Sequence, residues 1–397
     1  MTTVNQRITG LLHKPLEPLR AAGRTDAGAW PVIGGLILIA VVFGSLNEHF
    51  LSAENLTNLA LQMAATGTIS LGIIMVILLG EIDLSAGSVS GLCAVVMTIL
   101  YVHHGWNPLV AVAAALGCAV LVGLLHGWMF TKLRMPSFVV TLAGLIGWQG
   151  LMLYLLGRGG TINLPFEGLL AGLSDTWLPL WAGWLVAALI VAGWSAGSLV
   201  NRRLRRGADL PVTSGLWLTL RLAGLAGVLA VVVLVLSADR GVPLLLVIFG
   251  TLVVCLDLML RHTVFGRHMY AVGGNAEAAR RAGINITRIR VLAFVAGSTL
   301  AAFGGILAAS RLAAVNQSSG GSDTLLMAIA AAVIGGTSLF GGRGRAYAAL
   351  LGILVIQSIT NGMLLLSVDS SVRYMVTAAV LAIAVAIDSL ARRGQPR

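Results

Sequence analysis

The sequence predicts an all-α protein that crosses a membrane many times. Of its 397 residues, 57% are hydrophobic and only 10% are charged, and the mean hydropathy is +0.93. A soluble globular domain carries about a quarter charged residues, so this chain has too few charges to cover a surface in water. Apolar runs near or above the roughly 20 residues that cross a bilayer recur from end to end. The fold class is therefore a polytopic helical membrane protein.

About twelve of these runs are long enough to be counted as membrane spans. Two of them, Ser88–Tyr101 and Leu325–Phe340, are short, and we expect broken or re-entrant helices there. The second is rich in Ala and Gly, which is typical of tight helix packing or of an interrupted helix that lines a cavity. The expected spans are Trp30–Phe43, Leu56–Leu79, Ser88–Tyr101, Leu109–Phe130, Phe138–Leu156, Leu178–Leu199, Leu216–Leu236, Val242–Leu260, Val291–Ser310, Leu325–Phe340, Ala346–Leu366 and Tyr374–Leu390.

The basic residues predict the orientation of these spans. With the N-terminus in the cytoplasm, the inner loops hold most of the basic residues, while the outer loops combine few arginines with several carboxylates. The positive-inside rule therefore favours a cytoplasmic N-terminus and a cytoplasmic C-terminus. The net charge of +11 follows from this topology, and no nucleic-acid partner is expected. The inner segments are 1–29, 80–87, 131–137, 200–215, 261–290, 341–345 and 391–397.

The chain is expected to form one transmembrane domain. A cytoplasmic N-terminal arm covers 1–29, a single transmembrane domain covers 30–390, and a cytoplasmic tail covers 391–397. The arm is polar and lacks the features of a cleavable signal peptide. The 3 cysteines lie in separate apolar runs, without the paired spacing of metal ligands or disulfides, so no metal site is expected.

The longest polar run between apolar segments, 261–290, contains a short helix with clear ends. Asn275 is a suitable N-cap, because its side-chain oxygen can accept from the free N–H groups of the first turn. Glu277 lies near the positive end of the helix dipole and Arg280 near the negative end, and Gly283 provides a left-handed stop. A helix of roughly two turns is not stable alone in water, so it must pack on its own protein or on a partner.

A second stretch, GEIDLSAGS at 80–88, places two carboxylates between apolar spans. Carboxylates at membrane depth are costly and are functional candidates, and the alternative is a cytoplasmic turn in which Asp83 or Ser85 caps the following helix. Proton coupling through Glu81 and Asp83 is a third possibility. It is weakened because we expect no intramembrane His, Lys or third carboxylate except Asp257 to accompany them. The residues of this pathway or structural turn are Glu81, Asp83, Ser85 and Gly87.

A third stretch, GGTSLFGGRGR at 335–345, ends an Ala-rich span. Its glycine pairs suit close helix approach or a sharp turn, and a packing turn is favoured over a phosphate-binding loop because no strand precedes it and no Lys-Ser/Thr follows. The chain also lacks a GxxxxGK(S/T) P-loop, so any ATPase must be a separate chain. No cofactor is expected on this chain and no enzyme activity. The residues of this second Gly turn are Gly335, Gly336, Thr337, Ser338, Gly341 and Gly342.

Together these stretches resemble the permease subunits of bacterial ABC importers for ribose, xylose, arabinose and galactosides. The motifs that match, in order, are GEIDLSAGSVSG, GRHMYAVGGNAEAARRAGI and AAAVIGGTSLFGGRGR, and KLRMPSFVVTLAG at 132–144 matches as well. The likeness covers the chain from about Leu51 onward. An extra segment at 178–239 adds two helices, and it is similar to an insertion in the xylose-type permeases.

The resemblance implies a multi-pass subunit of the bacterial inner membrane that translocates a monosaccharide, with D-xylose as the first choice. It also implies a separate ATPase that uses ATP, a periplasmic or lipid-anchored sugar-binding protein, and a second permease copy, all in membrane lipid. The segment 261–290 becomes a cytoplasmic coupling loop whose helix seats on the ATPase. The matching positions are Gly274, Asn275, Glu277, Ala278, Ala279, Arg280, Arg281 and Gly283. An ion-gradient-driven secondary transporter of a small polar solute is the alternative, and it would need no coupling helix.

Overall fold

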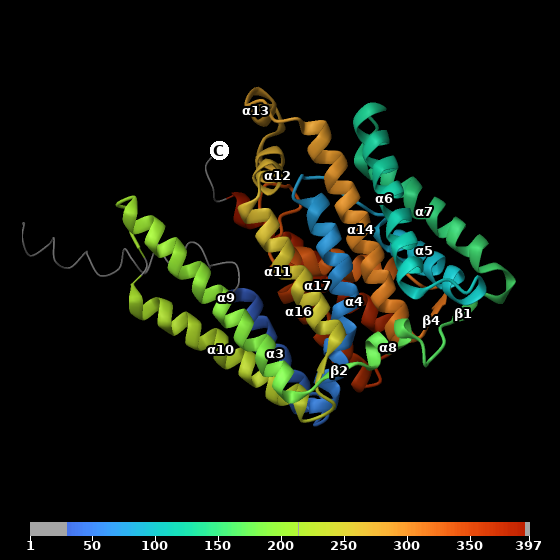
Figure 1. The fold of residues 1–397 in the computed structure, drawn as a ribbon, viewed down its shortest axis with the longest axis horizontal. Helices are drawn as coiled ribbons and strands as arrows, with labels where there is room; N and C mark the ends of the chain where they lie inside the picture. Colours follow the sequence, from blue (N-terminus) through green and yellow to red (C-terminus); the bar gives the residue numbers. More distant parts are fainter. Residues whose placement is uncertain (1–29, 213, 394–397) are drawn as a thin grey trace, which may run out of the picture.

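The computed structural model describes residues 30–212 and 214–393. The predicted arm at 1–29 and the last part of the predicted tail, 394–397, lie outside the described residues. Within the described part, 9 helices are long and apolar enough to cross a membrane, and three shorter apolar helices accompany them. Each expected span coincides with one of these helices (Figure 1). The predicted fold class, an all-α polytopic membrane protein, is confirmed.

The boundaries of the helices follow the apolar runs closely. The helices that match the expected spans are α3 (Trp30–Leu46), α4 (Ala53–Ile77), α5 (Ala86–Thr98), α6 (Pro108–Lys132), α7 (Ser137–Leu156), α9 (Leu180–Gly207), α10 (Gly215–Ser237), α11 (Leu244–His262), α14 (Ile286–Leu312), α15 (Ser322–Ile334), α16 (Tyr347–Leu365) and α17 (Ser370–Arg393). The shorter elements are α8 (Leu169–Asp175), α12 (Val264–Gly274) and α13 (Ala276–Arg281), a π-helical turn at Ile99–His103 and a 3-10 turn at Gly157–Gly159.

Local capping explains several of these ends. Ser52 accepts from the backbone N–H of Asn55 at the start of α4, and Asn107 accepts from Leu109 at the start of α6, where Pro108 occupies the first turn. Proline suits that position because its missing N–H would have no helical partner there. Gly157 ends α7 with a φ of 62°, a conformation that favours glycine.

The core lies around α4 and α14. In the most apolar window of α4, 89% of the residues are buried, against 56% in α14. The two helices approach closely because glycines face each other: a Cβ on Gly72 would lie 2.5 Å from the carbonyl oxygen of Gly297. Small residues at such crossings are the usual means of close helix packing in membranes.

The two short spans differ from each other. The π-helical turn extends α5 to His103, and the combined helix Ala86–His103 has 18 residues and counts among the 9 long ones of the described chain. By contrast α15 has 13 residues. At 1.5 Å per residue it is about 20 Å long, less than the roughly 30 Å hydrocarbon core. It ends at the second Gly turn, so the span expected at Leu325–Phe340 is a short helix followed by a turn.

The segment 178–239 folds into a hairpin of α9 and α10 that diverges from the bundle (Figure 1). Only 11% of the most apolar window of α9 and 6% of that of α10 are buried. Its two ends are held together by a short antiparallel ribbon in which β2 (Trp177–Leu178) pairs with β3 (Val242–Pro243). A second ribbon pairs β1 (Thr161–Asn163) with β4 (Ala314–Asn316), on either side of the α8 to α14 segment.

Candidate functional site

The three sequence stretches, far apart in the chain, meet at the end of the bundle that carries α12 and α13 (Figure 1). The backbone N–H of Gly342 donates to the carbonyl oxygen of Leu78 at 2.9 Å. A Cβ on Gly273 would lie 1.8 Å from the same oxygen and 2.7 Å from the nitrogen of Gly342. Backbone therefore touches backbone at a site referred to below as the three-loop junction, formed by 78–80, 273–274 and 341–342.

Glycine is required in the junction for two reasons. Gly80, Gly341 and Gly342 have φ angles of 77°, 80° and 71°, in the left-handed region. A side chain on Gly341 would also place its Cβ 2.6 Å from the nitrogen of Gly80. Residues with a Cβ would be strained at these positions and would push the loops apart.

A side chain of α12 adds a polar tie to the second Gly turn. The Tyr270 hydroxyl donates to the carbonyl oxygen of Gly344 at 2.8 Å. Burial raises the pKa of Tyr270, and the negative charge of Asp257 raises it further. The phenol therefore stays protonated and keeps its proton for this bond.

Within the second Gly turn, close contacts again dominate. A Cβ on Gly335 would lie 1.9 Å from the carbonyl oxygen of Ala348 on α16, and Gly336 has a φ of 99°. The N–H of Ser338 donates to the carbonyl oxygen of Arg343 at 3.0 Å, and Thr337 is buried beside it. This geometry is that of a tight packing turn.

The short helix α13 begins and ends where its sequence predicts. The Asn275 side chain accepts from the N–H of Ala278 at 2.9 Å, and Gly283 has a φ of 82° after the last turn. Glu277 lies 3.6 Å from Arg280 and 3.6 Å from Arg281. These side chains are largely exposed, so the ion pairs are screened and contribute little to stability.

One face of α13 packs on the protein and the other is open. Ala279 is buried, whereas Glu277, Ala278 and Arg280 are exposed. The sequence left open whether this helix rests on its own chain or on a partner. In the structure, the Ala279 face of α13 rests on its own chain, and the opposite face is exposed.

Glu81 connects the junction to two transmembrane helices. One carboxylate oxygen lies 3.0 Å from a guanidinium nitrogen of Arg290 at the start of α14. The other accepts from the hydroxyl of Ser137 at the start of α7, at 2.7 Å. The Arg290 guanidinium in turn lies over the ring of Phe130, 4.7 Å from its centroid. Glu81 therefore has a partner on each side and is held in one position.

Asp83 and Ser85 form a buried pair at the start of α5. One oxygen of Asp83, which is 3% exposed, accepts from the N–H of Ser85 at 2.8 Å and from its hydroxyl at 2.6 Å. Ser85 stands at the N-cap position but makes no capping bond with its side chain. Asp83 supplies the acceptor instead, in the way that an Asx turn does. Gly87 then lets the loop before α15 approach, because a Cβ there would lie 2.7 Å from the carbonyl oxygen of Gly320.

The expectation that no intramembrane histidine accompanies these carboxylates was wrong. His126 of α6 is 1% exposed, and its Nδ1 lies 3.5 Å from the Ser85 hydroxyl. Its Nε2 accepts from the indole N–H of Trp148 on α7 at 3.0 Å. His126 lies inside the expected span Leu109–Phe130, so a search of that span for ionisable residues finds it. Nothing in the sequence indicates its partner Trp148.

This arrangement is not that of a hydrolase. Because an indole N–H can only donate, Nε2 of a neutral His126 is the acceptor and Nδ1 carries the proton toward Ser85. The hydroxyl of Ser85 donates to Asp83. A catalytic histidine accepts the serine proton, and here the direction is reversed. The Asp83–Ser85–His126–Trp148 network therefore links the start of α5 to α6 and α7, and its donor directions do not activate Ser85.

A polar cavity that sequence reasoning missed lies among α4, α5, α14 and the segment that precedes α15. It has a volume of about 200 Å³ and carries the side chains of Gln62, Thr66, Ser90, Asn316 and Thr324. Gln62 and Thr66 are one helical turn apart on α4, which is the signal that could have indicated a polar face on an otherwise apolar span.

Comparison of the sequence with known proteins places the chain in a transporter family. The family described as branched-chain amino acid transport system / permease component matches residues 55–385. The xylose transport system permease protein of Escherichia coli (strain K12) is 34% identical over 370 residues, covering 91% of this chain and 92% of the relative. That of Haemophilus influenzae is 34% identical over 358 residues, covering 89% and 95%.

The ribose import permease protein of Escherichia coli (strain K12) is 32% identical over 359 residues, covering 90% of this chain and 92% of the relative. No solved structure matches the chain significantly. The similarity to the xylose and ribose proteins extends over nearly the whole chain and includes all three stretches of the junction. The chain therefore belongs to this family of transport permeases and, within it, to the permease subunits of monosaccharide ABC importers.

Proposed function

We propose that this chain imports D-xylose as the permease subunit of an ABC importer. The choice of xylose is supported by the match, along about nine-tenths of the chain, to two proteins named as xylose permeases. The extra segment at 178–239, which the sequence analysis likened to an insertion in xylose-type permeases, folds as the α9–α10 hairpin. We further propose that two copies of the chain enclose the pathway.

The chain is a multi-pass protein of the bacterial inner membrane, and a permease of this family works with an ATPase and a sugar-binding protein. In this proposal the ATPase is a separate chain that receives the exposed face of α13. Ala278 and Arg280 would lie in a groove of the ATPase, while Ala279 holds the helix against the permease.

The observation that carries the coupling proposal is that both flanks of α13 contact the same loop. On the N-terminal side, Gly273 of α12 touches the carbonyl oxygen of Leu78. On the C-terminal side, Arg290 of α14 forms an ion pair with Glu81. A displacement of α13 therefore reaches the loop 78–85 from two directions. Close-packed backbone transmits such a shift, because the contacts have no space in which to relax.

From this loop the displacement would pass to the helices around the pathway. Asp83 and Ser85 stand at the start of α5, and His126 and Trp148 connect that point to α6 and α7. The second turn of α5 borders the polar cavity through Ser90 and Gly91. Sugar hydroxyls need hydrogen-bond partners when they leave water, and the polar side chains of this cavity can be those partners.

The test is sugar uptake into vesicles that contain this chain, an ATPase of the same importer class and a pentose-binding protein. Wild type is compared with Ala278→Trp, which adds bulk to the exposed face of α13 without entering the core. Ala208→Trp, an exposed alanine in the connection between α9 and α10, is the matched control. Xylose uptake that requires ATP and the binding protein, and that disappears in Ala278→Trp alone, is expected.

A second readout separates assembly from transport. The amount of ATPase that co-purifies with the full-length permease should fall in Ala278→Trp and remain normal in Ala208→Trp. Normal co-purification and normal uptake in Ala278→Trp would show that α13 is not the docking element. Uptake of ribose in preference to xylose would leave the importer in place and overturn the sugar assignment.

A proton-driven secondary transporter is the second candidate function. The observation that favours it is the buried contact of Asp83, through Ser85, with His126. In the same vesicles, an imposed proton gradient without ATP would then drive uptake, and Ala278→Trp would have no effect. That result would replace the importer proposal.

A further inference from the structure

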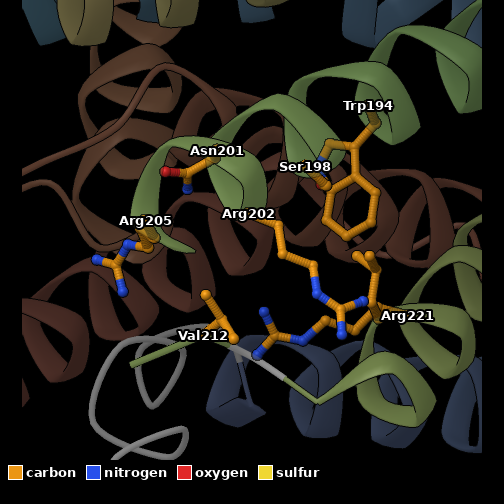
Figure 2. Close-up of a pocket in the computed structure, with 8 residues that line it drawn as sticks. Trp194, Ser198, Asn201, Arg202, Arg205, Val212 and Arg221 are labelled. Carbon is orange, nitrogen blue, oxygen red and sulfur yellow. The ribbon is translucent and has the colours of Figure 1, made fainter. Parts of the chain in front are cut away.

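The α9–α10 hairpin contains a pocket that the transport cycle described above does not use. It has a volume of about 300 Å³ and lies between the two helices, near the connection that joins them (Figure 2). Its lining combines arginines from both helices with the indole of Trp194 and the polar side chains of Ser198 and Asn201. All of its lining residues belong to the hairpin or its connection, so this pocket is separate from the three-loop junction.

The charge of the pocket is strongly one-sided. Arg202 and Arg205 of α9 and Arg221 of α10 line it, and none of the described lining residues is acidic. Like charges that face one space raise its potential and attract an anion. Three arginines in a single pocket of a hydrophobic hairpin therefore point to a bound anionic group.

Arg202 gives the clearest indication. Its Nε is buried and has no hydrogen-bond partner among the described residues. A buried donor without an acceptor is unfavourable by about 1–3 kcal/mol, and more when the group is charged. Figure 2 shows the side chains of Arg202 and Arg221 extending into the same space below Trp194. An oxyanion in that space would accept from Arg202 and neutralise the repulsion.

The other arginines are already placed by their surroundings. Arg205 donates to the carbonyl oxygen of Pro211 at 3.2 Å, which holds it at the edge of the pocket beside the connecting loop. The Arg221 guanidinium lies 5.4 Å from the ring centroid of Trp217 and makes a further interaction. The features that favour an anion are therefore the buried Nε of Arg202 and the summed positive charge of the pocket.

The position of the pocket identifies the source of the anion. Only 11% of the α9 window and 6% of the α10 window are buried, so most of the hairpin would face lipid in a membrane. The arginine cluster lies at the end of α9 that the positive-inside rule places in the cytoplasm. Basic pockets between helices at that level bind the head groups of anionic lipids. Trp194 is an interfacial residue type and supplies an apolar wall for the chain of the lipid.

We propose that this pocket binds the phosphate of an anionic phospholipid from the inner leaflet. The planar guanidinium of Arg202 can engage a phosphate with two parallel hydrogen bonds, which a lysine ammonium cannot. Asn201 and Ser198 can donate to the glycerol or phosphate oxygens. The bound lipid would tie the hairpin, which has little contact with the bundle, to the membrane surface.

The test is binding of phosphatidylglycerol to the full-length protein in detergent micelles, measured by native mass spectrometry as lipid is titrated. Arg202→Gln is compared with Arg203→Gln, the adjacent exposed arginine that does not line the pocket. We expect the tightest phosphatidylglycerol site to weaken by about fivefold in Arg202→Gln and further in Arg202→Gln with Arg221→Gln. Arg203→Gln should bind as wild type, and Arg202→Lys should fall between.

Three outcomes would overturn the proposal. Equal loss in Arg202→Gln and Arg203→Gln would mean a general charge effect without a site. Equally tight binding of phosphatidylcholine would mean that negative charge is not recognised. Displacement of the lipid by millimolar inorganic phosphate would mean that the pocket takes a soluble anion. An unchanged midpoint of thermal unfolding in lipid-free micelles shows that the variants are folded.

Discussion

The three-loop junction and the α9–α10 hairpin contain similar residues and are packed in opposite ways. Both are rich in glycine next to apolar helices. In the junction, a Cβ on Gly273 would lie 1.8 Å from a carbonyl oxygen, whereas in the hairpin Gly197 and Gly224 have no atom within 4 Å of the corresponding position. Glycine therefore permits backbone contact in the first region and has no packing role at these two positions of the second.

The polar groups of the two regions differ in the same way. Glu81 and Asp83, which follow the junction segment 78–80 in the chain, each accept from two donor groups within hydrogen-bond distance. In the hairpin, Arg202 keeps a buried nitrogen without a partner among the described residues. The two carboxylates are therefore satisfied within this chain. Arg290 Nε, beside the junction, is also buried without a partner among the described residues, but only Arg202 lines a pocket that a ligand can enter. Substitutions should therefore affect transport in the first region and lipid contact in the second.

The largest contrast should come from glycine substitution. Gly273→Ala forces a backbone shift against Leu78, and overpacking of this kind destabilises by about 1–3 kcal/mol. Uptake should fall roughly tenfold or more, because the shift lies on the proposed path from α13. Gly224→Ala should be neutral or stabilising by about 0.5–1 kcal/mol, since alanine favours a helix. Uptake and thermal unfolding of both variants measure the difference, and equal effects would contradict the comparison.

Next in size should be the effect of Asp83→Asn. The charged acceptor for the Ser85 N–H and hydroxyl is lost, which we expect to cost about 1–3 kcal/mol at the start of α5. Uptake should fall while membrane abundance stays near normal. Asp209→Asn is the control, because Asp209 is exposed and has a φ of 51° that Asn tolerates. Transport that survives Asp83→Asn would remove this residue from the coupling path.

A smaller effect should separate two ion pairs. In Glu81–Arg290 the side chains are 15% and 29% exposed, and in Asp239–Arg240 they are 19% and 44% exposed. Double-mutant cycles with Gln and Asn substitutions should give a coupling energy of about 1–2 kcal/mol for the first pair. The second pair should give about 0–1 kcal/mol, because water screens it. Equal coupling energies would show that the junction does not depend on Glu81.

The smallest energetic change should come from the helix caps. Asn275→Ala and Ser214→Ala each remove one capping bond, to Ala278 and Trp217 respectively, and each should cost about 1 kcal/mol. The consequences should differ, because α13 has 6 residues and α10 has 23. Loss of the cap should unfold most of α13 and reduce ATPase co-purification, while α10 frays at one end. Normal co-purification with Asn275→Ala would mean that α13 forms without its cap.

The helical spans and the short capped helix could be predicted from the sequence alone. Hydropathy alone places the spans, because a helix must keep roughly 20 apolar residues in the bilayer whatever its neighbours are. The ends of α13 follow from Asn275 and Gly283, which act within one turn. The resemblance of the three motifs to the sugar permeases was likewise sufficient to predict the family. These are local features or motif matches, and none requires knowledge of the packing.

Contacts between distant residues, by contrast, became visible only in the folded structure. The contact of Gly273 with Leu78 and Gly342, and that of His126 with Ser85 and Trp148, join segments that are far apart in the sequence. Such contacts depend on the angles and depths at which helices cross. These cannot be predicted from one apolar sequence, because several faces of each helix are equally hydrophobic. In the sequence, Arg202 is a loop charge, and Arg221 lies near the inner end of the expected span Leu216–Leu236. The turn between α9 and α10 brings them to one pocket, and with it creates the site proposed for the lipid.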